Sequence, residues 1–312
     1  MRSALSEWRI GNVLIEQGKL DEALNAYRKS LAIAEELAAS DHTNDPYRQN
    51  DVSVSYEKIG NVLARQGQLN EALKSYQDSL VIRERLVAAD PNNTRWQRAV
   101  YVSLWRIGDI EIRQRNLDAA LADFRRGLKV MERLLTTDRN NTQWQGDVGS
   151  AYVKVGDVLF QQDKVDEALT AYRESLTMRE RLAAFDQSNA YWQYGLGISH
   201  ERIASVLEAR GDFVGALKEY EAKREIISRL AVLDPSNAGW QRDLAISYGK
   251  LGFIYQQQGN IAEALVEYKK GREIIAQLLA TARNDADWNK DLADFDRLIA
   301  QLEGRTQEAG KN

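Results

Sequence analysis

A cation recurs along this chain at a nearly constant spacing, and it is the strongest candidate for chemistry. It stands two residues before a small residue that returns six times, as glycine in five copies and alanine in the fifth. The cations are Arg9, Lys58, Arg106, Lys154, Arg202 and Lys250. One residue after the same small residue stand Asn12, Asn61, Asp109, Asp157, Ser205 and Phe253. Cations beside amides can make charge-assisted hydrogen bonds to carboxylates, which are the stronger kind.

The same cations could instead hold the fold together. Asp109 and Asp157 would neutralise part of the strip, and exposed ion pairs are common in folded proteins. Further acidic residues open the neighbouring helical segments, namely Glu22, Glu71, Glu167 and Glu263. Partner binding and internal pairing are therefore both open interpretations of the cation series.

Trp105 is a second candidate, because it stands where most other copies carry a small or charged residue. An aromatic side chain on a binding wall can anchor a partner. Trp8 shares the position, however, so both tryptophans could pack locally.

Signs of catalysis are absent from the sequence. The chain has two histidines, His42 and His200, which are 158 residues apart and cannot share a site in an elongated array. We find no glycine-rich phosphate loop, nucleophile elbow or metal-ligand spacing. The sequence therefore predicts no enzyme, no cofactor and no metal site.

The small residue belongs to an internal repeat of 48 residues. Its six copies are Gly11, Gly60, Gly108, Gly156, Ala204 and Gly252, and a second landmark is Tyr47, Trp96, Trp144, Trp192, Trp240 and Trp288. Copy two holds one extra residue between its landmarks, which predicts a shifted helix start or a π-bulge. Repetition at one period means that each unit buries its apolar face by stacking on its neighbours.

Each repeat reads as two helices joined by a tight turn. In the sixth copy, apolar residues recur every three or four positions from Trp240 to Tyr255, and again from Ala264 to Leu278. Gly259 between them favours the left-handed conformation that ends a helix. We call the first helix of each repeat helix A and the second helix B.

Small residues on both helices predict a close crossing of their backbones. The alanine of helix B is present in every copy, as Ala23, Ala72, Ala120, Ala168, Ala216 and Ala264. A glycine inside a helix costs about 1 kcal/mol relative to alanine, so its recurrence needs a packing reason. An aromatic residue four positions after each alanine can fill the space beside the glycine.

This pattern resembles the tetratricopeptide repeat. The family's motif stands here as Tyr248, Leu251-Gly252, Tyr255, Ala264 and Tyr268. The family's usual period is about 34 residues, so this chain is similar to long-period arrays such as those of kinesin light chains and related bacterial proteins. About seven added residues would lengthen each helix by roughly 10 Å.

The resemblance implies an all-α, right-handed superhelix of six helix pairs with a C-terminal capping helix. It places repeats at approximately 1–42, 43–90, 91–138, 139–186, 187–234 and 235–283, a capping helix at 286–303 and a flexible tail at 304–312. It also implies that helix A lines a concave groove, where the cations and amides would bind a partner protein or peptide, and an acidic partner would suit the cations.

Composition limits the remaining choices. The net charge of -4, with both signs interspersed, argues against a nucleic-acid partner. There are no cysteines, and no secretory signal or membrane span is visible, so we expect a cytoplasmic protein.

The expected function is a non-catalytic scaffold for protein–protein interaction. An alternative is the sensor or regulatory array of a larger bacterial signalling or defence protein, whose effector domain would lie outside this chain. Self-association through the first helix, with Leu5 and Trp8 near an open edge, is a further possibility.

Overall fold

The computed structural model describes residues 3–41, 45–281 and 285–309, and within them every regular element is an α-helix. The alternating A and B helices of the repeat are all present. Their bounds are α1 Ala4–Glu16, α2 Leu20–Ala39, α3 Pro46–Arg65, α4 Leu69–Ala89, α5 Thr94–Arg113, α6 Leu117–Thr137, α7 Thr142–Gln161, α8 Val165–Phe185, α9 Ala190–Ala209, α10 Phe213–Leu233, α11 Ala238–Gln257, α12 Ile261–Thr281 and α13 Ala286–Ala309.

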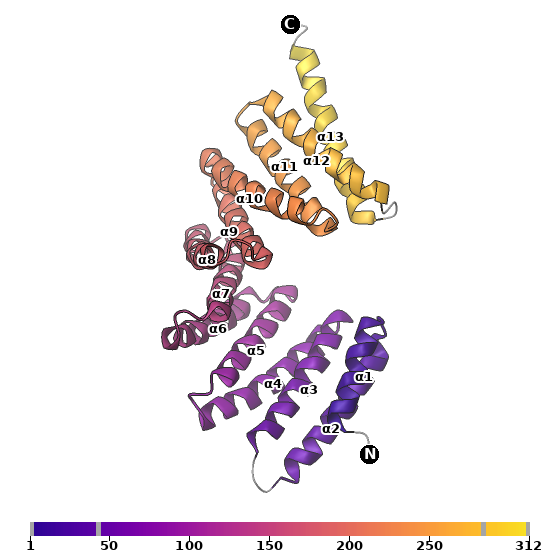
Figure 1. The fold of residues 1–312 in the computed structure, drawn as a ribbon, viewed down its shortest axis with the longest axis vertical. Coiled ribbons are helices and arrows are strands. Elements are labelled where there is room, and N and C mark those ends of the chain that lie inside the picture. Colours follow the sequence, from indigo (N-terminus) through magenta and orange to yellow (C-terminus); the bar gives the residue numbers. More distant parts are fainter. Residues whose placement is uncertain (1–2, 42–44, 282–284, 310–312) are drawn as a thin grey trace. The chain divides into compact units, whose positions relative to one another are not determined.

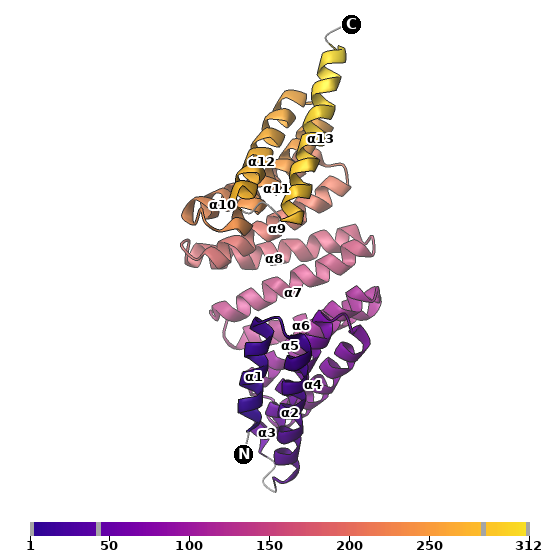
Figure 2. The ribbon, with the colours of Figure 1, turned by 90° about the vertical axis from the view of Figure 1, so that its right-hand side faces the viewer.

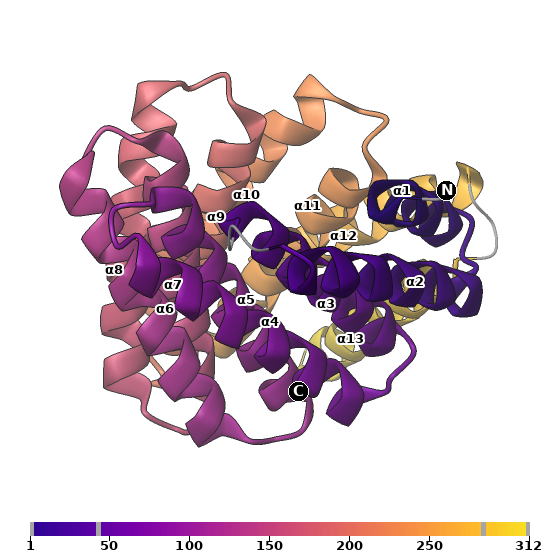
Figure 3. The same ribbon diagram turned by 90° about the horizontal axis from the view of Figure 1, so that it is seen from below.

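The chain divides into two compact units, Met1–Lys164 with α1–α7 and Val165–Asn312 with α8–α13. Within the first unit each helix packs on the next, and α1 lies beside α2 in every view (Figure 1, Figure 3). Within the second unit α11, α12 and α13 lie side by side (Figure 2). The all-α repeat fold is confirmed in each unit. The continuous right-handed superhelix concerns how the units join and stays a prediction.

Local chemistry accounts for where the helices start and turn. The side chain of Asn237 accepts a hydrogen bond from the backbone N–H of Trp240 at 3.1 Å, which caps α11. Asn93, Asn141 and Asn189 cap α5, α7 and α9 in the same way. The predicted turn glycine Gly259 has a φ of 82°. A side chain there would be strained, which explains the choice of glycine.

The predicted close crossing of helices A and B is present. A Cβ built on Gly60 would lie 2.6 Å from the ring of Tyr76, and one on Gly11 would lie 2.5 Å from Tyr27. Alanine at these positions would therefore collide with the aromatic ring. The six alanines of helix B are all fully buried, at 0 % exposure. The glycine, the alanine and the aromatic residue together set the distance between the two helices.

The tryptophans of the second landmark are not equally buried, although their regular spacing predicts that all of them belong to the core. Trp96 is buried at 8 % exposure, whereas Trp144, Trp192, Trp240 and Trp288 are half-buried. These tryptophans stand in the first turn of helix A or, for Trp288, of α13. Trp240 and Trp288 pack against the buried clusters of the second unit.

Tyr47 does not belong to that series, which corrects the second landmark in copy two. Helix α3 begins 14 residues before Gly60 (60 − 46), as α5 begins 14 residues before Gly108 (108 − 94). The extra residue therefore precedes α3, and α3 has neither the shifted start nor the π-bulge. Tyr47 is 65 % exposed as a result.

The predicted flexible tail at 304–312 is wrong for residues 304–309. Helix α13 continues past the expected end at residue 303 to Ala309. Gly304, the first residue of the predicted tail, has no neighbouring atom within 4 Å of an added Cβ, so it lies on an open face of the helix. Residues 310–312 lie outside the described part of the chain.

Candidate basic groove

The first three repeats share a polar groove of about 750 Å³ on the helix A side of the first unit. It is lined by residues of α1 to α5, and we call it the basic groove. Its lining residues are Asn12, Ile15, Glu16, Tyr27, Lys58, Asn61, Val62, Ala64, Arg65, Tyr76, Arg106 and Arg113. Four of these side chains are cations and one is a carboxylate, so the groove carries a positive excess.

Two tyrosines from helix B hold the amides of the groove in place. The hydroxyl of Tyr27 donates to Oδ1 of Asn12 at 2.7 Å, and that of Tyr76 donates to Oδ1 of Asn61 at 2.8 Å. Each tyrosine ring lies against the helix A glycine, so the hydroxyl emerges beside the amide one position later. Because Oδ1 is engaged by the hydroxyl, the Nδ2 group is the donor that each amide can offer to a ligand.

Burial keeps these tyrosines protonated. It raises the pKa of Tyr76 to about 12, although the nearby guanidinium of Arg106 acts in the opposite direction. Burial also raises the pKa of Tyr27. Both hydroxyls therefore remain donors to their amides at neutral pH.

The later members of the cation series are engaged inside the protein. Lys154 Nζ lies 2.6 Å from Oδ1 of Asp109 and 5.4 Å from the ring centre of Trp105. Trp105 is half-buried, and its Nε1–H donates to the other oxygen of Asp109 at 3.0 Å. Trp105 is thus bound into an internal cluster rather than fully free to anchor a partner.

The second unit repeats this arrangement with different residues. Lys250 Nζ lies 3.4 Å from Oε2 of Glu208 and 5.7 Å from the ring centre of Tyr220. Arg202 and Asp157 each have an interaction partner as well. For Lys154 and Lys250, the internal pairing interpretation holds.

Asp109 is one of the two aspartates expected to neutralise part of the cation series, whereas Glu208 was not expected, and neither partner is a glutamate that opens a helix B. Asp109 and Glu208 lie on helix A of the preceding repeat, whereas the expected glutamates, such as Glu263, open helix B. Those glutamates follow the turn that ends helix A. Eight residues separate Lys250 from that turn (258 − 250), which is about 12 Å along a helix.

The first two repeats carry an amide, Asn12 or Asn61, at the position that Asp109 occupies in the third repeat. Asp109 precedes its partner Lys154 by 45 residues, and Asn61 precedes Arg106 by the same number. Asn12 precedes Lys58 by 46, since copy two has its extra residue. Within the described residues, neither Lys58 nor Arg106 has a carboxylate at ion-pair distance. Lys58 lies instead 5.4 Å from the ring centre of Trp8.

The structure therefore places some of the predicted site residues in the basic groove and others outside it. It brings Asn12, Lys58, Asn61 and Arg106 together in the basic groove. Arg9 is exposed on α1, outside the groove lining. The remaining predicted residues, Trp105, Asp109, Lys154, Asp157, Arg202 and Lys250, lie elsewhere.

Two groove cations, Arg65 and Arg113, were missed from the sequence. Both lie five residues after the repeat glycine, in the last turn of α3 and α5. The Nη1 group of Arg113 donates to the carbonyl oxygen of Ala64 at 2.9 Å, which bridges two repeats. A usable signal was available, since Arg65 follows Lys58 by seven residues and so shares its helix face.

Other chemistry has little support among the described residues. No cluster of His, Asp or Glu there could hold a metal ion. His200 contacts Glu219 at 2.7 Å, and His42 lies outside the described residues. None of the described helices is long and apolar enough to cross a membrane.

Two family models described as tetratricopeptide repeat match this chain. One matches residues 9–44, 52–92 and 148–186, and the other matches residues 245–276. No curated protein matches it.

Solved structures with the same fold are distant in sequence. BtubC (BKLC) from P. vanneervenii is 16% identical with a TM-score of 0.65, over 83% of this chain and 92% of that one. The apo form of RapI is 12% identical with a TM-score of 0.57, over 98% and 99%. A signal transduction ATPase (STAND) protein with a tetratricopeptide repeat sensor from Pyrococcus horikoshii is 12% identical with a TM-score of 0.56, over 98% and 43%.

Proposed function

We propose, from the premise that this chain is a tetratricopeptide repeat protein, that it is a scaffold whose basic groove binds an acidic segment of a partner protein. The observation that carries the proposal is the replacement of Asp109 by amides in the first two repeats. It leaves Lys58 and Arg106 without the internal carboxylate that Lys154 has.

The geometry of the groove favours a carboxylate-rich ligand. Lys58, Arg65, Arg106 and Arg113 face one acidic residue, Glu16, across the same lining. The Nδ2 groups of Asn12 and Asn61 add neutral donors between the cations. Carboxylates can accept from both kinds of donor, and charge-assisted bonds are about twice as strong as neutral ones.

A charge-reversal experiment tests the proposal. The groove variant carries Lys58→Glu, Arg65→Glu and Arg106→Glu. The control variant carries Lys74→Glu, Arg85→Glu and Arg133→Glu, which change net charge equally at exposed positions on helix B. Fluorescence anisotropy measures binding of a labelled oligo-glutamate peptide to each protein at increasing salt concentration.

We expect the groove variant to bind the peptide at least about tenfold more weakly, and the control to stay within about twofold of the wild type. Equal affinity of the groove variant and the wild type would refute the proposal. Thermal denaturation of both variants checks that the fold is intact. Capture from lysate by the wild type and not by the groove variant then identifies the natural partner.

A second candidate is the sensor array of a larger signalling protein. The fold match to the STAND protein favours it, because this chain covers 98% of its own length but 43% of that one. The full-length gene distinguishes the candidates, since an adjoining catalytic domain would support the sensor function.

A further inference from the structure

A small cavity lies between α1, α2 and α3 of the first unit. Its volume is about 230 Å³, and its wall is mostly apolar. The large apolar residues of the wall are Leu5, Trp8 and Val54, and the polar ones are Ser30, Asp51 and Ser55. None of these residues lines the basic groove, so the cavity is a separate site.

The first two repeats pack in the same way around this position. Ser30 Oγ donates to the carbonyl oxygen of Ala4 at 2.9 Å, and Ser79 Oγ donates to that of Ser53 at 2.8 Å. The cavity can therefore be compared with the second repeat position by position. Residues of α1 and α2 correspond to residues 49 positions later (79 − 30), and those of α3 to residues 48 positions later (108 − 60).

Arg83 fills the corresponding space in the second repeat. Its side chain is 4 % exposed, and its guanidinium reaches four of the seven lining positions. The residues that it contacts are Ser53, Glu57, Ala99 and Ser103, at the positions of Ala4, Trp8, Asp51 and Ser55.

The first repeat lacks this filling side chain. It carries Ala34 at the position of Arg83, and the third repeat carries Met131 there, which is fully buried. Alanine has no atom beyond Cβ, so a space that Arg83 and Met131 fill in the next two repeats stays open in the first.

The cavity keeps an acidic residue, but at a different position. Trp8 replaces Glu57, whereas Asp51 stands where the second repeat has Ala99. Among the described residues, no cation lies at ion-pair distance from the Asp51 carboxylate. Burial and the neighbouring charge of Asp45 raise the pKa of Asp51. A cation in the cavity would therefore stabilise the ionised carboxylate.

We propose that this cavity binds an alkylguanidinium cation, the chemical group that Arg83 supplies in the second repeat. The alkyl chain would lie against the apolar wall, and the guanidinium would donate to the carboxylate of Asp51 and to Oγ of Ser55. The hydroxyl of Ser55 already donates to the backbone carbonyl of Asp51 at 3.0 Å, so its oxygen can accept. Sites for drug-sized ligands start at about 300 Å³, so this cavity suits a group the size of one side chain.

The test is an NMR titration of the full chain, which follows the indole N–H resonance of Trp8. The probes are n-propylguanidinium, which has the atoms of an arginine side chain, and N-propylurea, its neutral counterpart of the same shape. We expect millimolar affinity for the cation and at least about tenfold weaker binding of the urea. Asp51→Asn should abolish this preference, since it removes the charge and keeps the shape.

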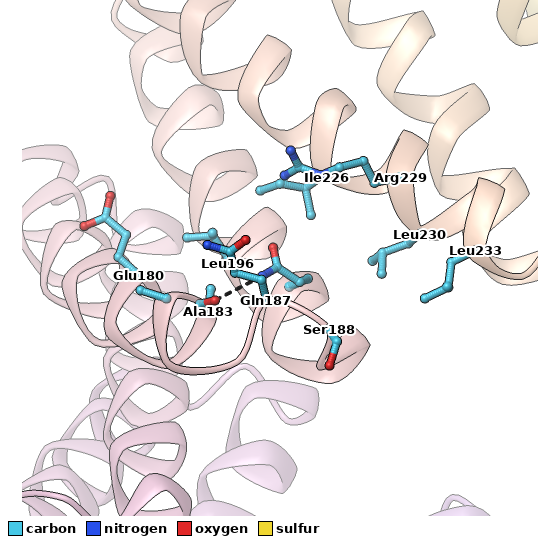
Figure 4. Close-up of a pocket in the computed structure, with 11 residues that line it drawn as sticks. Glu180, Ala183, Gln187, Ser188, Leu196, Ile226, Arg229, Leu230 and Leu233 are labelled. Carbon is cyan, nitrogen blue, oxygen red and sulfur yellow. Dashed lines mark hydrogen bonds between the residues drawn. The ribbon is translucent and has the colours of Figure 1, made fainter.

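Two further variants test the place of binding. Ala34→Met copies the third repeat, where Met131 accompanies Trp105, and it should fill the cavity and abolish binding of both probes. The matched control is Glu180→Gln, which should bind like the wild type. Glu180 is an exposed carboxylate that lines a larger cavity, of about 560 Å³, in the second unit (Figure 4). Thermal denaturation checks that each variant is folded.

A blocked arginine, N-acetylarginine N-methylamide, distinguishes two sources of the cation. Tighter binding than that of n-propylguanidinium would assign the site to an arginine of a partner chain, and weaker binding to a free small molecule. The proposal is overturned if neither guanidinium compound shifts the Trp8 resonance, if the wild type binds the urea as well as the cation, or if Ala34→Met binds like the wild type.

Discussion

The ammonium group of Lys154 and the carboxylate of Asp109 form an ion pair 2.6 Å long between the A helices of successive repeats. One repeat earlier, Asn61 stands in the place of Asp109 relative to the cation Arg106. The choice between Asp and Asn at this position therefore decides whether the cation of the next repeat forms an internal ion pair or lines the basic groove.

Restoring the acid should close the basic groove to acidic ligands. Asn61→Asp keeps the acceptor for the Tyr76 hydroxyl. It also places a carboxylate 45 residues before Arg106, the same interval by which Asp109 precedes Lys154. We expect affinity for the oligo-glutamate peptide to fall about tenfold, while the free energy of unfolding changes by less than about 1 kcal/mol. Anisotropy and urea denaturation measure the two effects, and undiminished peptide affinity would contradict this account.

The reverse substitution should extend the groove. Asp109→Asn removes the ion-pair partner of Lys154, while its remaining oxygen can still accept from Trp105. We expect peptide affinity to rise by severalfold and stability to fall by about 1 kcal/mol, because the pair is only partly exposed. The same two measurements apply, and a loss of peptide affinity would show that Lys154 cannot reach the ligand.

The regular parts of this fold could be predicted from the sequence because they depend on local chemistry. The asparagine that caps helix A and the glycine that turns into helix B act within a few residues of themselves. The Gly252 and Tyr268 pair could also be predicted, since six copies repeat it in phase. Element ends were predicted less well, as the continuation of α13 past Gly304 shows.

The function of individual cations could not be predicted in the same way. Whether Lys58 or Lys154 pairs internally depends on a residue 45 or 46 positions earlier, and that offset is set by how one repeat stacks on the next. Arg65 and Arg113 occur in two copies only, so no periodic signal marked them.

The contact between Gly60 and Tyr76 predicts that alanine at position 60 destabilises the protein, although alanine favours helices. Gly60→Ala should gain up to about 1 kcal/mol of helix propensity but lose more to the collision with the ring. We expect a net loss of about 1–3 kcal/mol in the free energy of unfolding. Gly304→Ala, where no atom lies near the added Cβ, is the control and should be neutral or stabilising. A more stable Gly60→Ala protein would mean that the crossing is not close.

Glu111 predicts a pH-dependent stability. It is buried at 8 % exposure in a position that is Leu14, Leu63, Leu159, Leu207 or Tyr255 in the other copies. Burial, with the neighbouring charge of Asp123, raises its pKa to about 7. The folded protein therefore holds a proton that the unfolded chain loses above its ordinary pKa, so stability falls as pH rises from about 4.5 to 7.

The corresponding experiment compares the wild type with Glu111→Gln at pH 5 and pH 8. The wild type should lose up to about 3 kcal/mol more than the variant over this interval, since each pKa unit corresponds to about 1.4 kcal/mol. Glu111→Leu should be the most stable of the three at pH 8. Parallel pH profiles for wild type and Glu111→Gln would show that Glu111 is not the group responsible.

Arg83 and Glu57 form a buried ion pair for which the chain itself supplies an apolar counterpart. Arg83 is 4 % exposed, lies 2.5 Å from Glu57 and also donates to Ser103 and to the carbonyl of Ala99. One repeat later the same two positions are Met131 and Trp105. The third repeat therefore folds without an ion pair at these two positions.

Breaking the pair on one side should cost more than replacing both residues. Arg83→Met alone should lower the free energy of unfolding by about 3–5 kcal/mol, because the Glu57 carboxylate is left without its partner in a largely buried site. Adding Glu57→Trp, which copies the third repeat, should recover at least half of that loss. Urea denaturation of the two single variants and the double variant measures the coupling between the positions. If the double variant is no more stable than Arg83→Met, the hydrogen bonds from Arg83 to Ser103 and Ala99, rather than the ion pair, stabilise this repeat.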